Sequence, residues 1–355
     1  MLKLIFIEKK TMKINISLDI VDGPYGGSHQ FLKALKTYLI NKQVYTDQIN
    51  IADVILFNSH QHADITAKIK QKHPDKIFIH RVDGPIRLYN TMNDTRDFLI
   101  NISNQLIADA TVFQSEWSMR KNHNMGLKKN KFEIIIHNAP DSLVFNKYEK
   151  LPFFSNRKIR LIATSWSSNW KKGFQIYKWL DNNLDFTKYE MTFIGNSPVK
   201  FKNINHIMPL KSKELSEKLK KNDIFILASQ IESCSNSLLE ALNCGLPVVA
   251  FNDSSNPEIV GNGGELFDKA EKIPTILEEI VKNYDQYQKN ISLPTIDEVG
   301  MWYYEFIYSI YKKVQEGKYK PKRLLKKDYL KLKFIILKWK LIEKINYLSQ
   351  KKNTS

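Results

Sequence analysis

Two glutamates with seven residues between them, Glu232 and Glu240, could bind a ligand rich in hydroxyl groups, because carboxylates accept hydrogen bonds from such groups. Between them lie Ser235, Asn236 and Ser237, whose backbone N–H groups are expected at the start of a helix. A helix N-terminus favours phosphate, because its N–H groups lack partners and the positive end of the helix dipole lies there. A ligand that combines sugar hydroxyls with phosphate, such as a nucleotide sugar, fits this pattern.

The elements that must hold these residues form a unit of strand, loop, helix and strand. Apolar runs at 224–228 and 248–251 predict two strands that are buried in a parallel sheet. Between them, Ser237 and Glu240 predict a capping box at the start of a helix. Gly245 predicts the end of this helix. The first loop of the unit therefore lies beyond the carboxyl end of a strand, where open α/β sheets bind their ligands.

This stretch resembles the donor-site motif of the retaining glycosyltransferases of family four, the glycosyl transferases group 1, which have the GT-B fold. The resemblance rests on Glu232 and Glu240 together with the runs LLEALNCGLPVVAF and NPEIVGNGGELFD. It implies that Glu232 approaches the donor sugar and that Glu240 approaches the nucleotide ribose. It further implies that no protein carboxylate acts as nucleophile and that the leaving phosphate can itself take the acceptor proton.

A glycine-rich turn separates a first strand, expected at 13–20, from a helix expected at 30–39. Glycines at a helix N-terminus let backbone amides approach a phosphate closely, although this turn lacks the full dinucleotide-binding pattern. The family resemblance implies that the loop faces the donor phosphates across a cleft between two domains. Gly26 and Gly27 are therefore candidate donor-binding residues.

Polar residues follow another predicted strand, at 76–80, and could handle a substrate. The resemblance implies that a His or an Asp at this strand end lies near the reactive carbon of the sugar and the acceptor. The sequence does not choose between His80 and Asp83, so both are catalytic candidates. In the alternative interpretation, Asp83 opens a turn and His80 is a partly buried histidine whose hydrogen bonds are satisfied.

A strand expected at 159–164 leads through a loop with Lys172 to a helix expected at 174–180. A lysine beside a glycine at such a turn can hold a diphosphate as a flexible point charge. The resemblance implies that an arginine a few residues earlier assists this lysine, but the position carries Ser167 or a neighbour, and the loop contains no arginine. Either a nearby residue substitutes for it or the donor is held by fewer charges. The residues that could substitute are Lys171, Asn169 and Trp170, and we take Asn169 as a donor-binding candidate.

The alternation of strands and helices starts again in the second half of the 355 residues, which suits two domains. We expect the α/β GT-B fold, in which two Rossmann-like domains with parallel sheets face each other across a cleft. Residues 1–11 are interpreted as an N-terminal extension or a mis-set start. The other expected parts are an acceptor-side domain at 12–150, a linker at 151–158, a nucleotide-sugar domain at 159–297, a crossing helix at 298–317 and a basic amphipathic helical tail at 318–355.

The net charge of +17 is concentrated at the C-terminus, where residues 318–352 carry thirteen Lys or Arg against Asp328 and Glu343. A basic helix that also carries aromatic and aliphatic residues can lie on an anionic membrane surface, so 318–350 predicts a membrane-binding segment. The alternative is a solvated helix or a coiled-coil extension. The longest apolar run in this tail, four residues, cannot span a bilayer. We expect a cytoplasmic protein that is peripheral at the inner face of the membrane.

These patterns predict a hexosyltransferase-type enzyme that uses a nucleotide-diphosphate sugar and a glycan or lipid-linked acceptor in surface polysaccharide or lipid-linked glycan synthesis. The chain contains no Asp-x-Asp sequence, and we expect neither a metal nor another cofactor. Cys234 and Cys244 have no metal-ligand spacing and are expected to be small buried residues. The alternatives are a non-enzymatic basic protein that binds nucleic acid or a membrane, and a GT-B relative that acts as a phosphorylase or epimerase. Nucleic acid is not an expected partner, because no nucleic-acid motif interrupts the α/β pattern.

Overall fold

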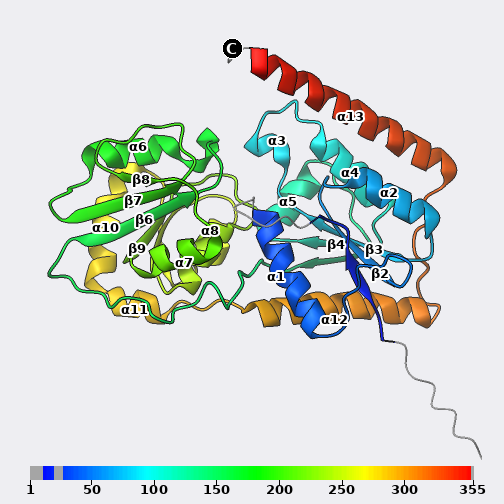
Figure 1. Cartoon of the computed structure of the whole chain (residues 1–355), viewed down its shortest axis with the longest axis horizontal. Helices are drawn as coiled ribbons and strands as arrows, with labels where there is room; N and C mark the ends of the chain where they lie inside the picture. Colours follow the sequence, from blue (N-terminus) through cyan, green and yellow to red (C-terminus); the bar gives the residue numbers. More distant parts are fainter. Residues whose placement is uncertain (1–10, 20–26, 353–355) are drawn as a thin grey trace, which may run out of the picture.

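Two parallel sheets form the framework of the chain, each with helices on both faces (Figure 1). The computed structural model describes residues 11–19 and 27–352. The predicted extension therefore lies outside the described residues except for its last position, and Gly26 also lies outside them. Alternation of parallel strands and helices confirms the predicted α/β class with two sheet domains.

The first sheet has five strands in the described residues, in the order β1-β2-β3-β4-β5. Strands β1 to β4 are buried along their whole length, because helices cover both sides of such a sheet. The edge strand β5 is half-buried. The strands are β1 Ile14–Ile16, β2 Val54–Asn58, β3 Ile77–Val82, β4 Ala110–Phe113 and β5 Phe132–Ile135, and the intervening helices are α1 Gly27–Asn41, α2 Ala63–Lys72, α3 Ile86–Tyr89, α4 Arg96–Leu106 and α5 Glu116–Asn124.

The second sheet has six strands in the described residues, in the order β11-β10-β9-β6-β7-β8. Residues 151–158, which precede it, contain no helix or strand. The strands are β6 Ile159–Ser165, β7 Tyr189–Gly195, β8 Asn205–Ile207, β9 Ile224–Leu227, β10 Val248–Phe251 and β11 Gly264–Phe267. The helices are η1 Trp170–Lys172, α6 Phe174–Asn183, α7 Ser212–Lys220, α8 Asn236–Asn243, α9 Asn256–Val260, η2 Ala270–Lys272, α10 Ile273–Lys282 and α11 Tyr284–Lys289.

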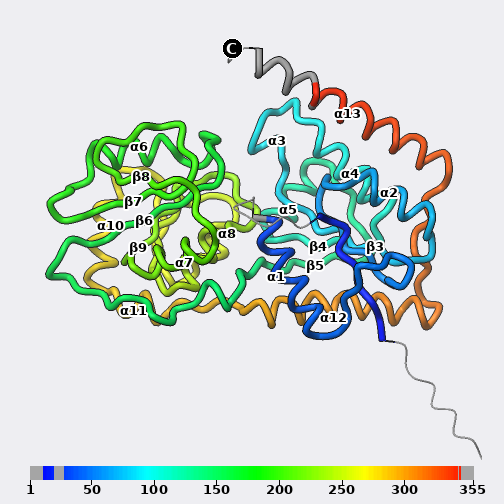
Figure 2. Tube along the Cα trace, viewed as in Figure 1, coloured from blue at the N-terminus to red at the C-terminus, as the bar shows by residue number. Residues whose placement is uncertain are grey.

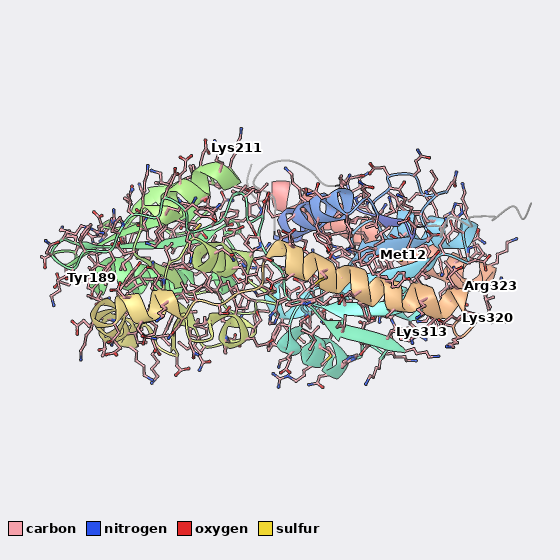
Figure 3. The ribbon with its side chains drawn as sticks, turned by 90° about the horizontal axis from the view of Figure 1, so that it is seen from below. Met12, Tyr189, Lys211, Lys313, Lys320 and Arg323 are labelled. Atoms are coloured by element: carbon pink, nitrogen blue, oxygen red, sulfur yellow. The ribbon has the colours of Figure 1, made fainter. Side chains whose placement is uncertain are left out.

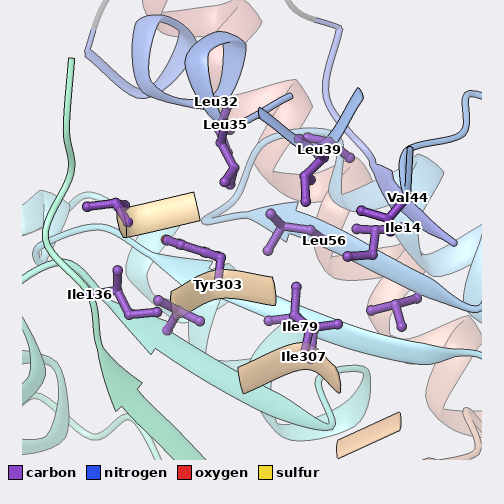
Figure 4. Packing of buried hydrophobic residues seen from close by; sticks show 14 of the residues in the cluster. Ile14, Leu32, Leu35, Leu39, Val44, Leu56, Ile79, Ile136, Tyr303 and Ile307 are labelled. Carbon is purple, nitrogen blue, oxygen red and sulfur yellow. The ribbon is translucent and has the colours of Figure 1, made fainter. Parts of the chain in front are cut away.

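A long helix, α12 Ile296–Gln315, carries the chain from the second domain back to the first (Figures 1, 2 and 3). It begins at a capping box in which the Thr295 hydroxyl accepts from the Glu298 N–H. Its buried residues Tyr303 and Ile307 belong to the core of the first domain, as Figure 4 shows. At Gly300 the helix passes so close to α1 that an added Cβ would lie 2.4 Å from the Tyr38 ring.

The basic tail is a structured helix, α13 Lys326–Lys352. It packs on α2 and α4, on the face of the first sheet opposite α12. Leu324, Leu332 and Ile336 are buried in this contact together with Phe57 and Phe78 of the sheet. One side of the helix therefore belongs to the core of the first domain. None of the helices in the described ranges is long and apolar enough to cross a membrane.

Candidate active site

A cleft of about 470 Å³ lies between the two domains, and residues of both domains line it. The carboxyl ends of β3, β6, β7 and β9 all contribute to its walls, as expected for a ligand site in open parallel sheets. The first domain contributes Ser28, Gln30, Asp83, Tyr89, Gln114 and Asn138, and the second contributes residues that include Trp166, Ser167, Lys172, Ser229, Glu232, Ser235, Asn236, Ser237 and Glu240.

The N-terminus of α8 points its first residues into this cleft. Ser235 caps the helix, because its hydroxyl accepts from the Leu238 N–H, so the prediction of a capping box at Ser237 is wrong. The Ser237 hydroxyl lies 3.0 Å from the Ser235 hydroxyl and lines the cleft. The helix therefore begins at Asn236, which also lines the cleft.

Lys172 and Glu232 form an ion pair in the second domain, with 2.5 Å between Nζ and Oε1. The Ser229 hydroxyl donates to the same carboxylate oxygen, and the Glu232 N–H donates to the Ser254 hydroxyl at 2.8 Å. Burial disfavours the charged lysine, but the Glu232 carboxylate offsets this effect and raises the pKa of Lys172. The opposite charges of Lys172 and Glu232 therefore balance each other.

Gly173 fixes the backbone next to this lysine. Its φ of +83° favours glycine, and an added Cβ would lie 2.1 Å from the carbonyl oxygen of Ala228 at the end of β9. The loop of Lys172 can therefore pass directly against the strand that precedes the Glu232 loop.

Glu240 lies in the second turn of α8 rather than in its first turn, and its side chain lines the cleft. Burial raises the pKa of its carboxyl to about 8, because the low-dielectric surroundings disfavour the charged form. At neutral pH this glutamate is therefore mainly in its protonated form.

Asp83 enters the cleft from the first domain and is held by several donors. Its carboxylate accepts from the Gln114 amide and from Arg81 Nη1 at 3.2 Å. Arg81 is fully buried, and its Nη2 donates to Asn138 Oδ1 at 2.8 Å. The Asn138 amide donates in turn to Asn236 Oδ1 at 2.8 Å, so a polar network links Asp83 to the helix end in the other domain.

The structure corrects the placement of His80. Strand β3 continues to Val82, so His80 lies inside it, fully buried and away from the cleft lining. Its ring nitrogens lie 3.0 Å from Asn104 Oδ1 and 3.0 Å from the Ser59 carbonyl oxygen. Burial lowers its pKa to about 4. These contacts match the alternative interpretation, a histidine whose hydrogen bonds are satisfied, and they leave His80 outside the cleft where the reaction would take place.

Tyr89 is a cleft residue that the sequence did not indicate. It ends the single turn α3 of the first domain, and its hydroxyl donates to the Ser167 hydroxyl at 2.8 Å. Lys172 Nζ lies 5.3 Å from the centre of its ring. Tyr89 thus lies beside Ser167, the position at which the family resemblance implies an arginine.

Asn169 and Gly27, the two other predicted donor-binding residues, lie next to residues that line the cleft. Asn169 is absent from the cleft lining. Its side chain instead accepts from the Lys171 N–H, caps η1 and donates to the carbonyl oxygen of Tyr89 at 3.2 Å. Gly27 is the first residue of α1, and its neighbour Ser28 lines the cleft.

Neither cysteine takes part in a disulfide, and both are buried. Burial raises the pKa of Cys234 to about 12 and that of Cys244 to about 11, so both thiols stay protonated. Within residues 11–19 and 27–352, no group of three or more His, Cys, Asp or Glu side chains could hold a metal ion.

Comparison with known proteins identifies the fold of the chain. Residues 199–292 match the family Glycosyl transferases group 1. A solved sucrose-phosphate synthase from Thermosynechococcus elongatus is similar over 85% of this chain and 99% of its own, with a TM-score of 0.67 and 10% identity. The Anabaena protein HepE in complex with UDP and glucose is similar over 86% of this chain and 99% of its own, with a TM-score of 0.60 and 14% identity. The chain therefore has the GT-B fold of these glycosyltransferases.

A relative known from its sequence is an uncharacterized 41.2 kDa protein of the cps region of Klebsiella pneumoniae. It is 24% identical over 184 residues, which are 48% of this chain and 51% of the relative. The match thus spans about half the length of that protein.

Proposed function

We propose that the chain is a retaining, metal-independent glycosyltransferase that transfers a hexosyl group from a nucleotide-diphosphate donor to an acceptor hydroxyl. One observation carries the proposal: Lys172, Glu232, Glu240 and the N-terminus of α8 all face one interdomain cleft. A lysine and a helix N-terminus suit a diphosphate, and carboxyl groups suit sugar hydroxyls. The HepE complex with UDP and glucose supports this class of ligand.

Binding of the donor would rearrange the ion pair. The diphosphate takes the Lys172 ammonium group from Glu232, because two phosphates carry more negative charge than one carboxylate. The Glu232 carboxylate is then free to accept hydrogen bonds from the sugar. The ribose hydroxyls donate to Glu240 at the other side of α8.

In the transfer step, the bond between the sugar C1 and the phosphate oxygen breaks and the acceptor oxygen bonds to C1 on the same face of the ring. Negative charge grows on the leaving nucleoside diphosphate, where Lys172 and the N–H groups at 235–237 stabilise it. The acceptor proton passes to the leaving phosphate, so no protein nucleophile is needed. Asp83, which Arg81 and Gln114 hold in place, orients the acceptor from the first domain.

Tyr89 takes over part of the role of the absent arginine in this proposal. Its hydroxyl can turn from Ser167 to a donor phosphate oxygen, because the Tyr89 ring lies beside Lys172 in the cleft. Tyr89→Phe should raise the KM for the donor roughly fivefold, because one hydrogen bond contributes about 1 kcal/mol. Steady-state kinetics and thermal unfolding of both proteins check this result.

Tyr148→Phe is the matched control, because Tyr148 is exposed and does not line the cleft. An unchanged KM in Tyr89→Phe would remove Tyr89 from the donor site. A large fall in the midpoint of unfolding would instead assign the hydroxyl to holding the two domains together.

The acceptor is proposed to be a glycan or a lipid-linked glycan in polysaccharide synthesis. The relative from the cps region supports this setting. A screen against UDP-, GDP-, ADP- and CMP-sugars in the presence of EDTA tests the proposed function by thermal shift and by release of the nucleotide. One nucleotide-diphosphate sugar should raise the midpoint of unfolding, and CMP-sugars, which have a single phosphate, should not. Failure of every donor, or activity only after a divalent cation is added, would contradict the proposal.

A further inference from the structure

Helix α13 exposes a second apolar side, whose residues belong to none of the hydrophobic core clusters of the described chain. Leu330, Phe334, Leu337 and Leu341 are 55%, 69%, 57% and 59% exposed. Their spacing of four, three and four residues places them along one face of the helix. We call these four residues the exposed stripe. Single exposed apolar residues are ordinary, but a continuous row of them marks an interaction surface.

The exposed stripe lies opposite the side of α13 that packs on the first domain. Leu332 and Ile336 are 0% and 3% exposed, and Trp339 contacts the His60 ring edge-to-face at 5.7 Å. At 100° per residue, these positions fall on the far side of the helix from the exposed stripe. The core contact therefore explains one apolar side and leaves the other unexplained.

Lysines flank the exposed stripe on both sides. Residues 326–344 contain seven lysines against Asp328 and Glu343. Helical spacing places Lys331 and Lys338 along one edge of the stripe and Lys333 and Lys344 along the other, and all four are exposed. A helix with an apolar stripe between two basic edges matches the interface of an anionic bilayer, where the apolar side chains enter the headgroup boundary and the lysines meet the phosphates.

This charge distribution disfavours a second copy of the chain as the partner. Two stripes packed together would bring basic edges side by side, with few acidic residues to pair with them. Four side chains also form a small patch compared with the roughly 800 Å² per partner of a stable interface.

Helix α13 is directed toward the edge of the first sheet where the cleft lies. Arg323, just before the helix, pairs with Asp75 after the end of α2, and Lys340 pairs with Asp64 at the start of α2. Helix α2 starts shortly after the carboxyl end of β2, so α13 runs toward the carboxyl edge of the sheet, where the cleft lies. Figure 1 shows its C-terminal end directed toward the side of the second domain.

We infer that the exposed stripe docks the chain on an anionic membrane surface and that the acceptor is a lipid-linked glycan presented there. The choice of acceptor rests on the proposed transferase function, whereas the docking does not. The first domain, which carries α13, would lie against the bilayer and turn its edge of the cleft toward the lipid headgroups.

Vesicle flotation with the full chain tests the docking. Phosphatidylcholine vesicles that contain phosphatidylglycerol should bind the chain, and vesicles of phosphatidylcholine alone should bind it at least tenfold less. The double substitution F334S and L337S should lower binding to the anionic vesicles by at least tenfold without changing the midpoint of unfolding, because both residues are exposed. The matched control is L143S with F154S, since Leu143 and Phe154 are 88% and 55% exposed outside α13.

A charge variant, K331E with K338E, should also lower binding to anionic vesicles. Equal binding by wild type and the stripe variant, or no binding by wild type, would overturn the inference. A dimer in light scattering that the stripe variant abolishes, without vesicle binding, would assign the surface to a second copy and also overturn it.

Nucleotide release with a soluble acceptor separates this inference from the proposed function. The stripe variant should keep wild-type release and lose only its preference for acceptors embedded in vesicles. An absence of release in every protein, with vesicle binding intact, would refute the transferase and the lipid-linked acceptor but leave the docking standing.

Discussion

Glu232→Gln should lower kcat roughly 10²- to 10³-fold, the size of effect that follows the loss of one preorganised hydrogen-bonding group at a reacting centre. Glutamine keeps the size of the side chain but cannot accept charge-assisted hydrogen bonds from the sugar hydroxyls. The substitution also removes the carboxylate that pairs with Lys172. The lysine is then free for the diphosphate, so the KM for the donor should stay constant or fall while kcat falls. Steady-state nucleotide release at several donor concentrations measures both values.

Glu217→Gln is the control for this substitution, because Glu217 is an exposed residue of α7 that does not line the cleft. Near-wild-type kcat in Glu232→Gln would remove Glu232 from the catalytic centre. A raised KM with unchanged kcat would assign it to uniform binding of the donor instead.

The affinity for the donor should increase with pH through the titration of Glu240. Burial raises the pKa of this carboxyl to about 8, whereas ribose hydroxyls donate best to its ionised form. Binding must then release a proton. The Kd should therefore fall about tenfold from pH 6 to pH 7, about fivefold from pH 7 to pH 8 and only about twofold from pH 8 to pH 9.

Titration calorimetry with an intact nucleotide sugar at pH 6, 7, 8 and 9 measures this dependence, since its phosphodiester groups do not titrate in that range. Glu240→Gln is the control and should give a Kd that is nearly independent of pH. A flat wild-type profile, or tighter binding at low pH, would show that the bound donor leaves Glu240 protonated.

The central unit of the second domain could be predicted well from the sequence because its signals are local. The bounds of β10 agree with the predicted range 248–251, and β9 begins at the predicted residue 224 and ends one residue before the predicted 228. The cap of α8 was misplaced because Ser235 and Ser237 are both good caps, and the choice depends on the path of the preceding loop. Local residue patterns do not determine the path of that loop.

The polar residues of β3 show the limit of local patterns. His80 and Arg81 suggested the end of the strand, yet both are fully buried. Their partners include Asn104 and Asn138, which are distant in the sequence. Partners of this kind become visible only when the chain is folded, so the end of the strand was predicted two residues too early.

The roles of Tyr89 and α13 also depend on contacts between residues that are distant in the sequence. The single turn that ends at Tyr89 is too short to give a helical pattern, and its contact with Ser167 joins the two domains. In α13, apolar residues on two opposite sides blur the amphipathic pattern of the tail. Only the packing of Leu332 and Ile336 on the first domain separates the buried side from the exposed one.

A crystal structure of the chain with the nucleoside diphosphate that the donor screen selects tests the central claim most directly. We predict that the ribose hydroxyls lie within hydrogen-bond distance of Glu240 and that the diphosphate lies at the N-terminus of α8. Lys172 Nζ should have left Glu232 for a phosphate oxygen. A nucleotide bound outside the cleft, or one whose diphosphate lies away from Lys172 with the ion pair to Glu232 intact, would contradict the proposed donor site.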